Sequence, residues 1–310
     1  MNYWHKDTQN RHNRGYGFIM LAGILWGFLG FFSASLAKQG LSTSTIAFLR
    51  LGLGTVFMLV LLLQTGNTRD LHLDKSGLLL VLAIGLLGQA GFNFFYSYAI
   101  GKVGLALGAV LLYTSPVFVA VLSRLFLREH LTAVKVGALT INVVGCILTV
   151  TGGQLHLAAL AWQGVAAGVL AGFLYALMTL LTTVGLRKYT SYNLCFYGFL
   201  VGAVALAFLH NPWPELQRAG SVTTFSLAAG YGLIPTVLAY LFYMKGIKEV
   251  TETSKVPVFA SVELLVASLL GFLYFGESCN GGKIVGIICV VFSILLLNLY
   301  PGGQQRGGKA

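Results

Sequence analysis

Long apolar segments alternate with short polar links along almost the whole chain. Each segment is about 20 residues long, which is the length that an α-helix needs to cross the hydrocarbon core of a bilayer. We therefore predict ten membrane-spanning helices, at residues 15–37, 44–64, 76–98, 104–126, 132–151, 162–186, 190–210, 222–246, 252–275 and 281–299. Because most links are short, helices that follow one another should be antiparallel neighbours.

The composition agrees with a membrane protein. Hydrophobic residues make up 56% of the chain and charged residues 9%, whereas a soluble domain has about 25% charged residues. The predicted fold class is therefore an all-α integral membrane protein, with the lipid bilayer as a partner. The net charge of +11 does not indicate a nucleic-acid binder, because the basic residues stand singly between apolar segments and form no basic cluster.

The positions of Lys and Arg predict the orientation, because cytoplasmic links carry an excess of both. With a cytoplasmic N-terminus, 15 of the 20 Lys and Arg residues lie inside and Arg50 lies within the bilayer, which leaves outside only Lys38, Lys102, Arg218 and Lys283. We expect an inner (plasma) membrane protein with both tails, residues 1–14 and 300–310, in the cytoplasm. The first apolar run is longer than the roughly 7–15 residues of a signal-peptide core, so we expect a retained helix.

The second half of the chain repeats features of the first. Residues 23–29 (GILWGFL) match residues 168–174 (GVLAGFL) at five of seven positions, 145 residues later. Further matches occur at offsets of 147 and 148: the trio Gln89, Asn93 and Tyr96 with Thr236, Tyr240 and Tyr243, and the pair Glu129 and Lys135 with Glu277 and Lys283. Each trio has the spacing i, i+4, i+7, which places it on one helix face.

The nearly constant offset predicts two repeats of five helices, residues 15–151 and 162–299. Because five is an odd number, the second repeat enters the membrane from the opposite side. Such an inverted repeat is typical of transporters that work by alternating access.

Several of these features resemble the EamA-type members of the drug/metabolite transporter superfamily. They are the two five-helix repeats, the helix-end Glu residues, the Gly-bearing last helix of each repeat, and the pairs Trp26-Gly27 and Ser115-Pro116. The resemblance covers about residues 15–299 and implies a carrier of amino acids, other metabolites or drugs, often in the efflux direction. The family commonly has Glu-Pro in the ninth helix, where this chain has Glu263-Leu264, so a less kinked ninth helix is one expectation.

Two charged residues fall deep inside predicted helices. Glu263 lies near the middle of the ninth helix, where a carboxylate costs about 2.5–3.5 kcal/mol, so it should face the bundle interior and have a partner. It either binds a substrate ammonium or exchanges protons, or it is a structural group that fixes helix packing. Arg50 pairs with Glu263, binds a substrate carboxylate, or snorkels to the outer interface, and we favour snorkelling or a structural role.

The two polar stripes are the best candidates for the wall of a substrate cavity. Polar side chains within the membrane must be satisfied internally, and symmetric stripes should converge near the midplane. We expect the substrate-binding residues to be Trp26, Gln89, Asn93, Tyr96, Tyr113, Tyr175, Thr236, Tyr240, Tyr243 and Glu263. Hydrogen bonding between helices without a ligand is the alternative for this set.

The helix-end pairs suggest a structural role rather than chemistry. Glu129 and Glu277 could cap helices or lock a gate through Lys135 and Lys283, respectively. No His or Cys spacing indicates a metal site, and Gly282-Lys283 lacks the rest of a phosphate-binding loop. We therefore expect no metal, no cofactor and no ATP drive.

The leading hypothesis is a secondary transporter, and an exporter rather than an importer, for an amino acid or amine. Tyrosine rings attract cations by roughly 0.5–2 kcal/mol, which favours such solutes over sugars or phosphates. A passive channel and an uptake carrier for a nucleotide-like metabolite or a cation such as choline remain alternatives. An enzyme is not expected, because no nucleophile–base pair lies at membrane depth. Protons are a candidate coupling ion, and the chain is a monomer or a homodimer.

Overall fold

The computed structural model describes residues 2–65, 71–154, 161–276 and 278–299, and every regular element in these ranges is a helix. Ten segments are long and apolar enough to cross a membrane, which confirms the predicted number. We call them spans 1 to 10 in chain order: Asn13–Ala37, Thr43–Gln64, Lys75–Val103, Leu105–Phe126, Ala133–Thr151, Trp162–Gly185, Ser191–Leu209, Val222–Glu249, Thr253–Phe275 and Gly281–Leu299.

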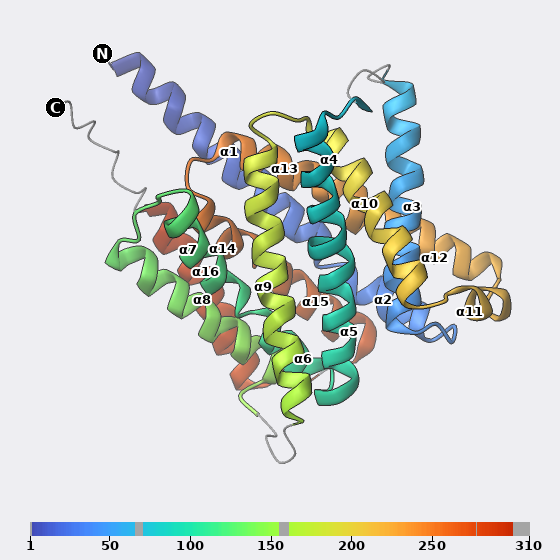
Figure 1. Ribbon diagram of the computed structural model, residues 1–310. Helices are drawn as coiled ribbons and strands as arrows, with labels where there is room; N and C mark the ends of the chain where they lie inside the picture. The colour runs from blue at the N-terminus through green and yellow to red at the C-terminus, as the bar shows by residue number, and fades with distance from the viewer. Residues whose placement is uncertain (1, 66–70, 155–160, 277, 300–310) are drawn as a thin grey trace.

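Five of the spans are built from more than one helix (Figure 1). In order, the spans contain α1 (Asn2–Trp26) and α2 (Leu29–Ala37); α3 (Thr43–Gln64); α4 (Lys75–Ala83), η2 (Ile84–Gly91) and α5 (Phe92–Val103); α6 (Leu105–Leu112) and α7 (Ser115–Phe126); α8 (Ala133–Thr151); α9 (Trp162–Gly185); α10 (Ser191–Leu209); α12 (Val222–Gly232), η3 (Leu233–Leu238) and α13 (Ala239–Glu249); η4 (Thr253–Lys255), α14 (Val256–Ala260) and α15 (Glu263–Phe275); and α16 (Gly281–Leu299). A short helix, α11 (Trp213–Arg218), lies in the link between spans 7 and 8.

Short polar side chains mark where many spans begin. Ser42 precedes α3 and Asp74 precedes α4, and each accepts a hydrogen bond from the backbone N–H three residues further on. Thr132, Thr190 and Ser221 cap α8, α10 and α12 in the same way. Such caps satisfy N–H groups that the first turn of a helix leaves free, so the polar links determine where each span starts.

The main helix contacts join the two halves of the chain. Span 1 packs beside span 8 through α1 and α13, and span 3 packs beside span 6 through α5 and α9. Span 2 lies against span 7 through α3 and α10, and span 5 against span 10 through α8 and α16 (Figure 1). Each of spans 1 to 5 has its counterpart five spans later in the chain. Exchanging every span for its counterpart gives the same set of pairs, as expected for two inverted repeats around a pseudo-two-fold axis.

The irregular segments also repeat. Spans 3 and 8 each contain a π-helical segment, η2 and η3. Span 4 is interrupted at Tyr113-Thr114, and span 9 is interrupted at Ser261-Val262, 148 positions later. The expectation of a less kinked ninth helix was therefore wrong, because the absence of proline after Glu263 does not keep this helix continuous.

Hydrogen bonds to a serine side chain hold the break in span 9. Ser261 donates its hydroxyl to the carbonyl of Val258 at 2.6 Å, and it accepts a hydrogen bond at 2.8 Å from the buried amide of Asn142 on α8. Asn142 also donates to Ser293 on α16 at 3.0 Å. The break is thus fixed by spans 5 and 10 and does not depend on proline at that point.

Candidate functional site

The breaks of spans 4 and 9 meet inside the bundle. Glu263 is the first residue of α15, and Tyr113 directly follows the last residue of α6. The Tyr113 hydroxyl donates a hydrogen bond of 3.1 Å to Oε1 of Glu263, and both side chains are half-buried. A carboxylate at a helix N-terminus is favoured by the positive end of the helix dipole. Glu263 thus lies at mid-span as predicted, but at a helix end and not within a continuous helix.

The repeated glycines of spans 1 and 6 pack against these two breaks. A Cβ on Gly23 would lie 2.5 Å from the carbonyl oxygen of Ala260, and one on Gly27 would lie 3.0 Å from that of Glu263. In the other half, a Cβ on Gly172 would lie 2.6 Å from Oγ1 of Thr114. The motif shared by the two halves therefore allows each first helix to touch the broken helix of the opposite half.

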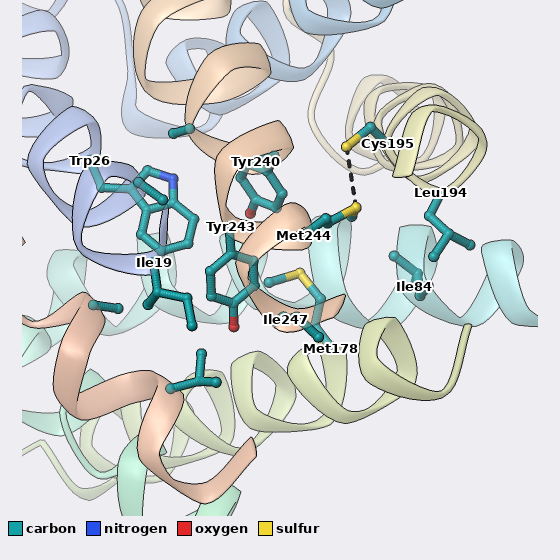
Figure 2. Packing of buried hydrophobic residues seen from close by; sticks show 14 of the residues in the cluster. Ile19, Trp26, Ile84, Met178, Leu194, Cys195, Tyr240, Tyr243, Met244 and Ile247 are labelled. Carbon is teal, nitrogen blue, oxygen red and sulfur yellow. Dashed lines mark hydrogen bonds between the residues drawn. The ribbon is translucent and has the colours of Figure 1, made fainter. Parts of the chain in front are cut away.

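Aromatic side chains beside this contact form one wall of the site. Figure 2 shows Trp26 of α1 facing Tyr240 and Tyr243 of α13, with ring centroids 5.5 Å and 4.9 Å apart. The Tyr243 hydroxyl lies 3.1 Å from Oγ1 of Thr179 on α9, and Tyr240 packs edge-on against Phe199. The sequence-predicted residues Trp26, Tyr240 and Tyr243 are thus brought together, in a well-packed core that gives each of them little exposure.

The remaining predicted aromatic residues lie between spans 3 and 6. Phe92 stacks on Tyr96 with a centroid distance of 5.8 Å and contacts Tyr175 of α9 at 5.7 Å. Tyr96 and Tyr175 are half-buried. Thr236 is different, because it is fully buried in η3 and donates its hydroxyl to the carbonyl of Tyr231 at 2.9 Å. Its hydrogen bond is used within its own span.

Arg50 is buried, with 6% of its surface exposed, which agrees with the structural alternative and not with snorkelling to the interface. Its Nη2 donates to Oδ1 of Asn93 at 3.2 Å, and Nδ2 of Asn93 donates to the carbonyl oxygen of Gln89 at 2.6 Å. The guanidinium also lies 6.0 Å from the centre of the Tyr231 ring. Within the described residues Arg50 forms no ion pair with Glu263.

Two polar atoms of this cluster have no hydrogen-bond partner in the described part of the chain. They are Nε of Arg50 and Oε1 of Gln89. The Gln89 side chain is 2% exposed, and its Nε2 contacts Sδ of Met178 at 3.4 Å. Buried polar groups are nearly always paired, so each exception requires an explanation.

The negative and positive groups act on the same two tyrosines. Glu263 and Arg50 both interact electrostatically with Tyr175 and with Tyr240. Tyr175 and Tyr240 therefore lie within electrostatic range of both a carboxylate on span 9 and a guanidinium on span 2, although those two groups form no direct pair in the described part of the chain.

A second polar cluster lies at the end of the bundle where α1 begins, which we call the N-terminal side. Glu129, just after span 4, accepts hydrogen bonds from the backbone N–H groups of Thr253 and Ser254 at 2.6 Å and 3.0 Å. It thus caps the start of span 9, in agreement with the capping role considered above. The residue before it, Arg128, has a left-handed backbone (φ 57°), as does its counterpart Gly276 (φ 63°).

Lys135 does not pair with Glu129, so the predicted gate pair was wrong. Lys135 instead forms an ion pair with Glu252, which also binds Lys255 at 2.6 Å. Partial burial by itself would raise the pKa of Glu252, but the hydrogen bonds from Lys135 and Lys255 outweigh it and hold the pKa below its ordinary value. In the second half, Glu277 lies outside the described residues, so a gate role for Glu277 and Lys283 stays a prediction.

A cavity of about 340 Å³ opens beside this cluster, between the ends of α7, α9 and α13. Its lining includes Glu129, Arg187, Lys248 and Thr253. Among the described residues, no group of three His, Cys, Asp or Glu side chains is placed to hold a metal ion.

The role of Asn142 was not predicted from the sequence. Its amide joins spans 5, 9 and 10, and it is completely buried. The signal was present, since an asparagine in the middle of an apolar span must find partners inside the bundle. Gln89 and Asn93 were selected because they are polar side chains within apolar spans, and the same criterion selects Asn142.

The two halves of the chain each match the model of one known family. The model of the EamA-like transporter family matches the chain twice, at residues 13–151 and 162–299. The chain belongs to the EamA-like transporter family. The resemblance noted from the repeats is thereby confirmed.

Curated relatives of this EamA protein are named as transporters. It is 28% identical over 282 residues to an uncharacterized transporter of Archaeoglobus fulgidus, with 90% of this chain and 94% of that protein covered. It is 23% identical to the pseudopaline exporter CntI of Pseudomonas aeruginosa (89% and 97% covered). It is 22% identical to a protein of Streptantibioticus cattleyicolor named "Probable terminal-alkyne amino-acid exporter" (87% and 89% covered).

A solved crystal structure has the same fold, with a TM-score of 0.78 at 16% identity over 92% of this chain and 96% of the other. Family, relatives and helices together identify the EamA protein as a multi-pass membrane transporter and not an enzyme.

Proposed function

We propose that this protein exports a small organic solute with an amino group, such as an amino acid or amine, by alternating access. The observation that carries the proposal is the Tyr113–Glu263 hydrogen bond at the meeting point of the two broken spans. A site at that point can respond to movement of either half. In inverted-repeat transporters, substrate sites lie near the midplane at such discontinuous helices.

The chemistry around Glu263 favours a cation. Its carboxylate can accept about four hydrogen bonds, and in the described residues the donor that it has is the Tyr113 hydroxyl. Tyr96 and Tyr175 lie within its electrostatic range, and tyrosine rings attract cations. We infer that an ammonium group of the solute binds at Glu263 and that protons compete for the same carboxylate, which would couple export to proton entry.

We further infer that the N-terminal side faces the cytoplasm and that the protein resides in the inner (plasma) membrane. The excess of Lys and Arg in the links on that side supports this orientation. The cavity beside Glu129 would then be a cytoplasmic entrance, and the Glu129 cap with the Lys135–Glu252 ion pair would hold spans 4, 5 and 9 together at that side. Export agrees with the names of two relatives, in which the word exporter appears.

Counterflow in proteoliposomes tests the proposal. Vesicles containing the purified full-length protein are loaded with one unlabelled amino acid or amine, and uptake of the same labelled solute is followed. A carrier should accumulate label transiently above equilibrium for at least one solute, and an imposed proton gradient should alter the rate. Simple equilibration without overshoot would indicate a channel and would contradict alternating access.

A further inference from the structure

We propose that Arg50 forms an anion subsite that binds a carboxylate of the transported solute, so that the preferred solute is a zwitterion and not a simple amine. This inference rests on the proposed function, because it concerns the same central site. It adds a second point of recognition on span 2, in addition to the carboxylate of Glu263 on span 9.

The positive charge of Arg50 has no carboxylate partner in the described part of the chain. A guanidinium stays protonated in proteins, so Arg50 cannot lose its charge as a buried carboxylic acid or lysine can. Its hydrogen-bond acceptor in the described residues is the neutral amide of Asn93, and its Nε has no partner. Burying a charge without an opposite charge is costly. A bound carboxylate would supply both the missing charge and the missing acceptor.

Asn93 is held by hydrogen bonds to both the oxygen and the nitrogen of its side-chain amide. Its oxygen accepts from Arg50, and its nitrogen donates to the carbonyl oxygen of Gln89. Asn93 therefore orients the guanidinium through a fixed amide while leaving Nε unused. The π-helical segment η2 contains Gln89, whose own Oε1 is also without a partner in the described part of the chain. Two unmet polar atoms in one cluster are unusual, and a ligand that makes polar contacts would account for them.

Glu263 and Arg50 offer charges of opposite sign, which is complementary to a zwitterionic solute. Glu263 supplies a carboxylate and Arg50 a guanidinium, and Tyr175 and Tyr240 lie within electrostatic range of both. A zwitterion placed along these rings would neutralise both charges, whereas an amine would leave Arg50 unpaired. A single guanidinium suits a monoanion such as a carboxylate better than a phosphate, which would require more cations.

Matched triads of solutes test the inference, and the natural substrate need not be identified first. One triad is leucine, 3-methylbutylamine and 4-methylpentanoate, and another is 6-aminohexanoate, hexylamine and hexanoate. Binding to the full-length protein in lipid nanodiscs is measured by titration calorimetry and by the shift in melting temperature. In at least one triad, the zwitterion should bind about 10- to 100-fold more tightly than the amine, as expected for one charged hydrogen-bonding contact.

The variant Arg50→Gln should remove the preference, so that the zwitterion binds no more tightly than the amine. Arg218→Gln, which alters an exposed arginine in the link before span 8, is the matched control and should retain the preference. Equal binding of amine and zwitterion by the unaltered protein, a measurement that needs no variant, would overturn the anion subsite while leaving the proposed function intact. If no member of any triad binds, the proposed solute class fails as well.

Discussion

The Tyr113 hydroxyl donates a hydrogen bond of 3.1 Å to the Glu263 carboxylate, and each residue lies at the break of its span. The break positions are 148 residues apart and correspond to one another in the two halves. A single hydrogen bond thus joins the irregular point of one repeat to that of the other. Relative movement of the halves must change or break this contact.

Glu263→Gln should reduce counterflow at least about 10-fold, because the neutral amide offers no charge to an ammonium and cannot exchange protons. Tyr113→Phe should give a smaller loss, since it removes one hydrogen bond and leaves the carboxylate. Tyr98→Phe, at an exposed tyrosine of α5, is the control and should be silent. All variants should elute as single peaks in size-exclusion chromatography. Full activity of Glu263→Gln would show that the carboxylate is dispensable.

Gly23→Ala should destabilise the protein by about 1–3 kcal/mol, the usual range for overpacking. The new methyl group would lie 2.5 Å from the backbone oxygen of Ala260, which cannot rotate away. Gly30→Ala in the same span meets no atom within 4 Å and should be neutral or slightly stabilising, because alanine favours helix. Thermal denaturation in detergent measures both. Equal melting temperatures would argue against close contact of span 1 with the break in span 9.

Glu252→Gln should destabilise the protein at neutral pH by about 3–5 kcal/mol, because it leaves Lys135 and Lys255 buried without a counter-charge. The pKa of Glu252 is lowered in the folded state. Its stabilising contribution is therefore complete above the ordinary carboxyl pKa and is lost as the pH falls through the lower folded value.

Melting curves of the unaltered protein and Glu252→Gln between pH 3 and 8 check this expectation. The two melting temperatures should converge at the acidic end and remain separated by a constant amount near neutrality. Asp74→Asn serves for comparison, because Asp74 pairs with Lys188 at an exposed position on the same side and should cost about 1 kcal/mol or less. A difference for Glu252→Gln that grows toward acidic pH would contradict the ion-pair assignment.

Single cysteines introduced at Lys38 or Lys283 should react with a membrane-impermeant maleimide added outside intact cells. A cysteine at Arg128 should react only after the cells are opened. The labelling requires a background without the four native cysteines, because Cys279 is exposed. The reverse pattern would place the N-terminal side outside and would exclude the orientation inferred from the basic residues.

The sequence by itself determined the ten spans and the inverted relation of the halves. These features are local: a helix that crosses a bilayer must be long and apolar, and a repeat is visible as a constant offset. The sequence also selected Glu263 and Arg50, since any charge at membrane depth is exceptional. For the same reason it could have selected Asn142.

Only the tertiary structure decided which groups are partners. Sequence spacing placed Lys135 beside Glu129, yet Lys135 binds Glu252, and Glu129 caps Thr253 and Ser254. Arg50 pairs with Asn93 on span 3 and not with the carboxylate of opposite charge on span 9. Spacing along the chain limits which residues share one helix face, but these partners come from different spans. Their pairing depends on how the spans pack against one another, which is a property of the folded bundle.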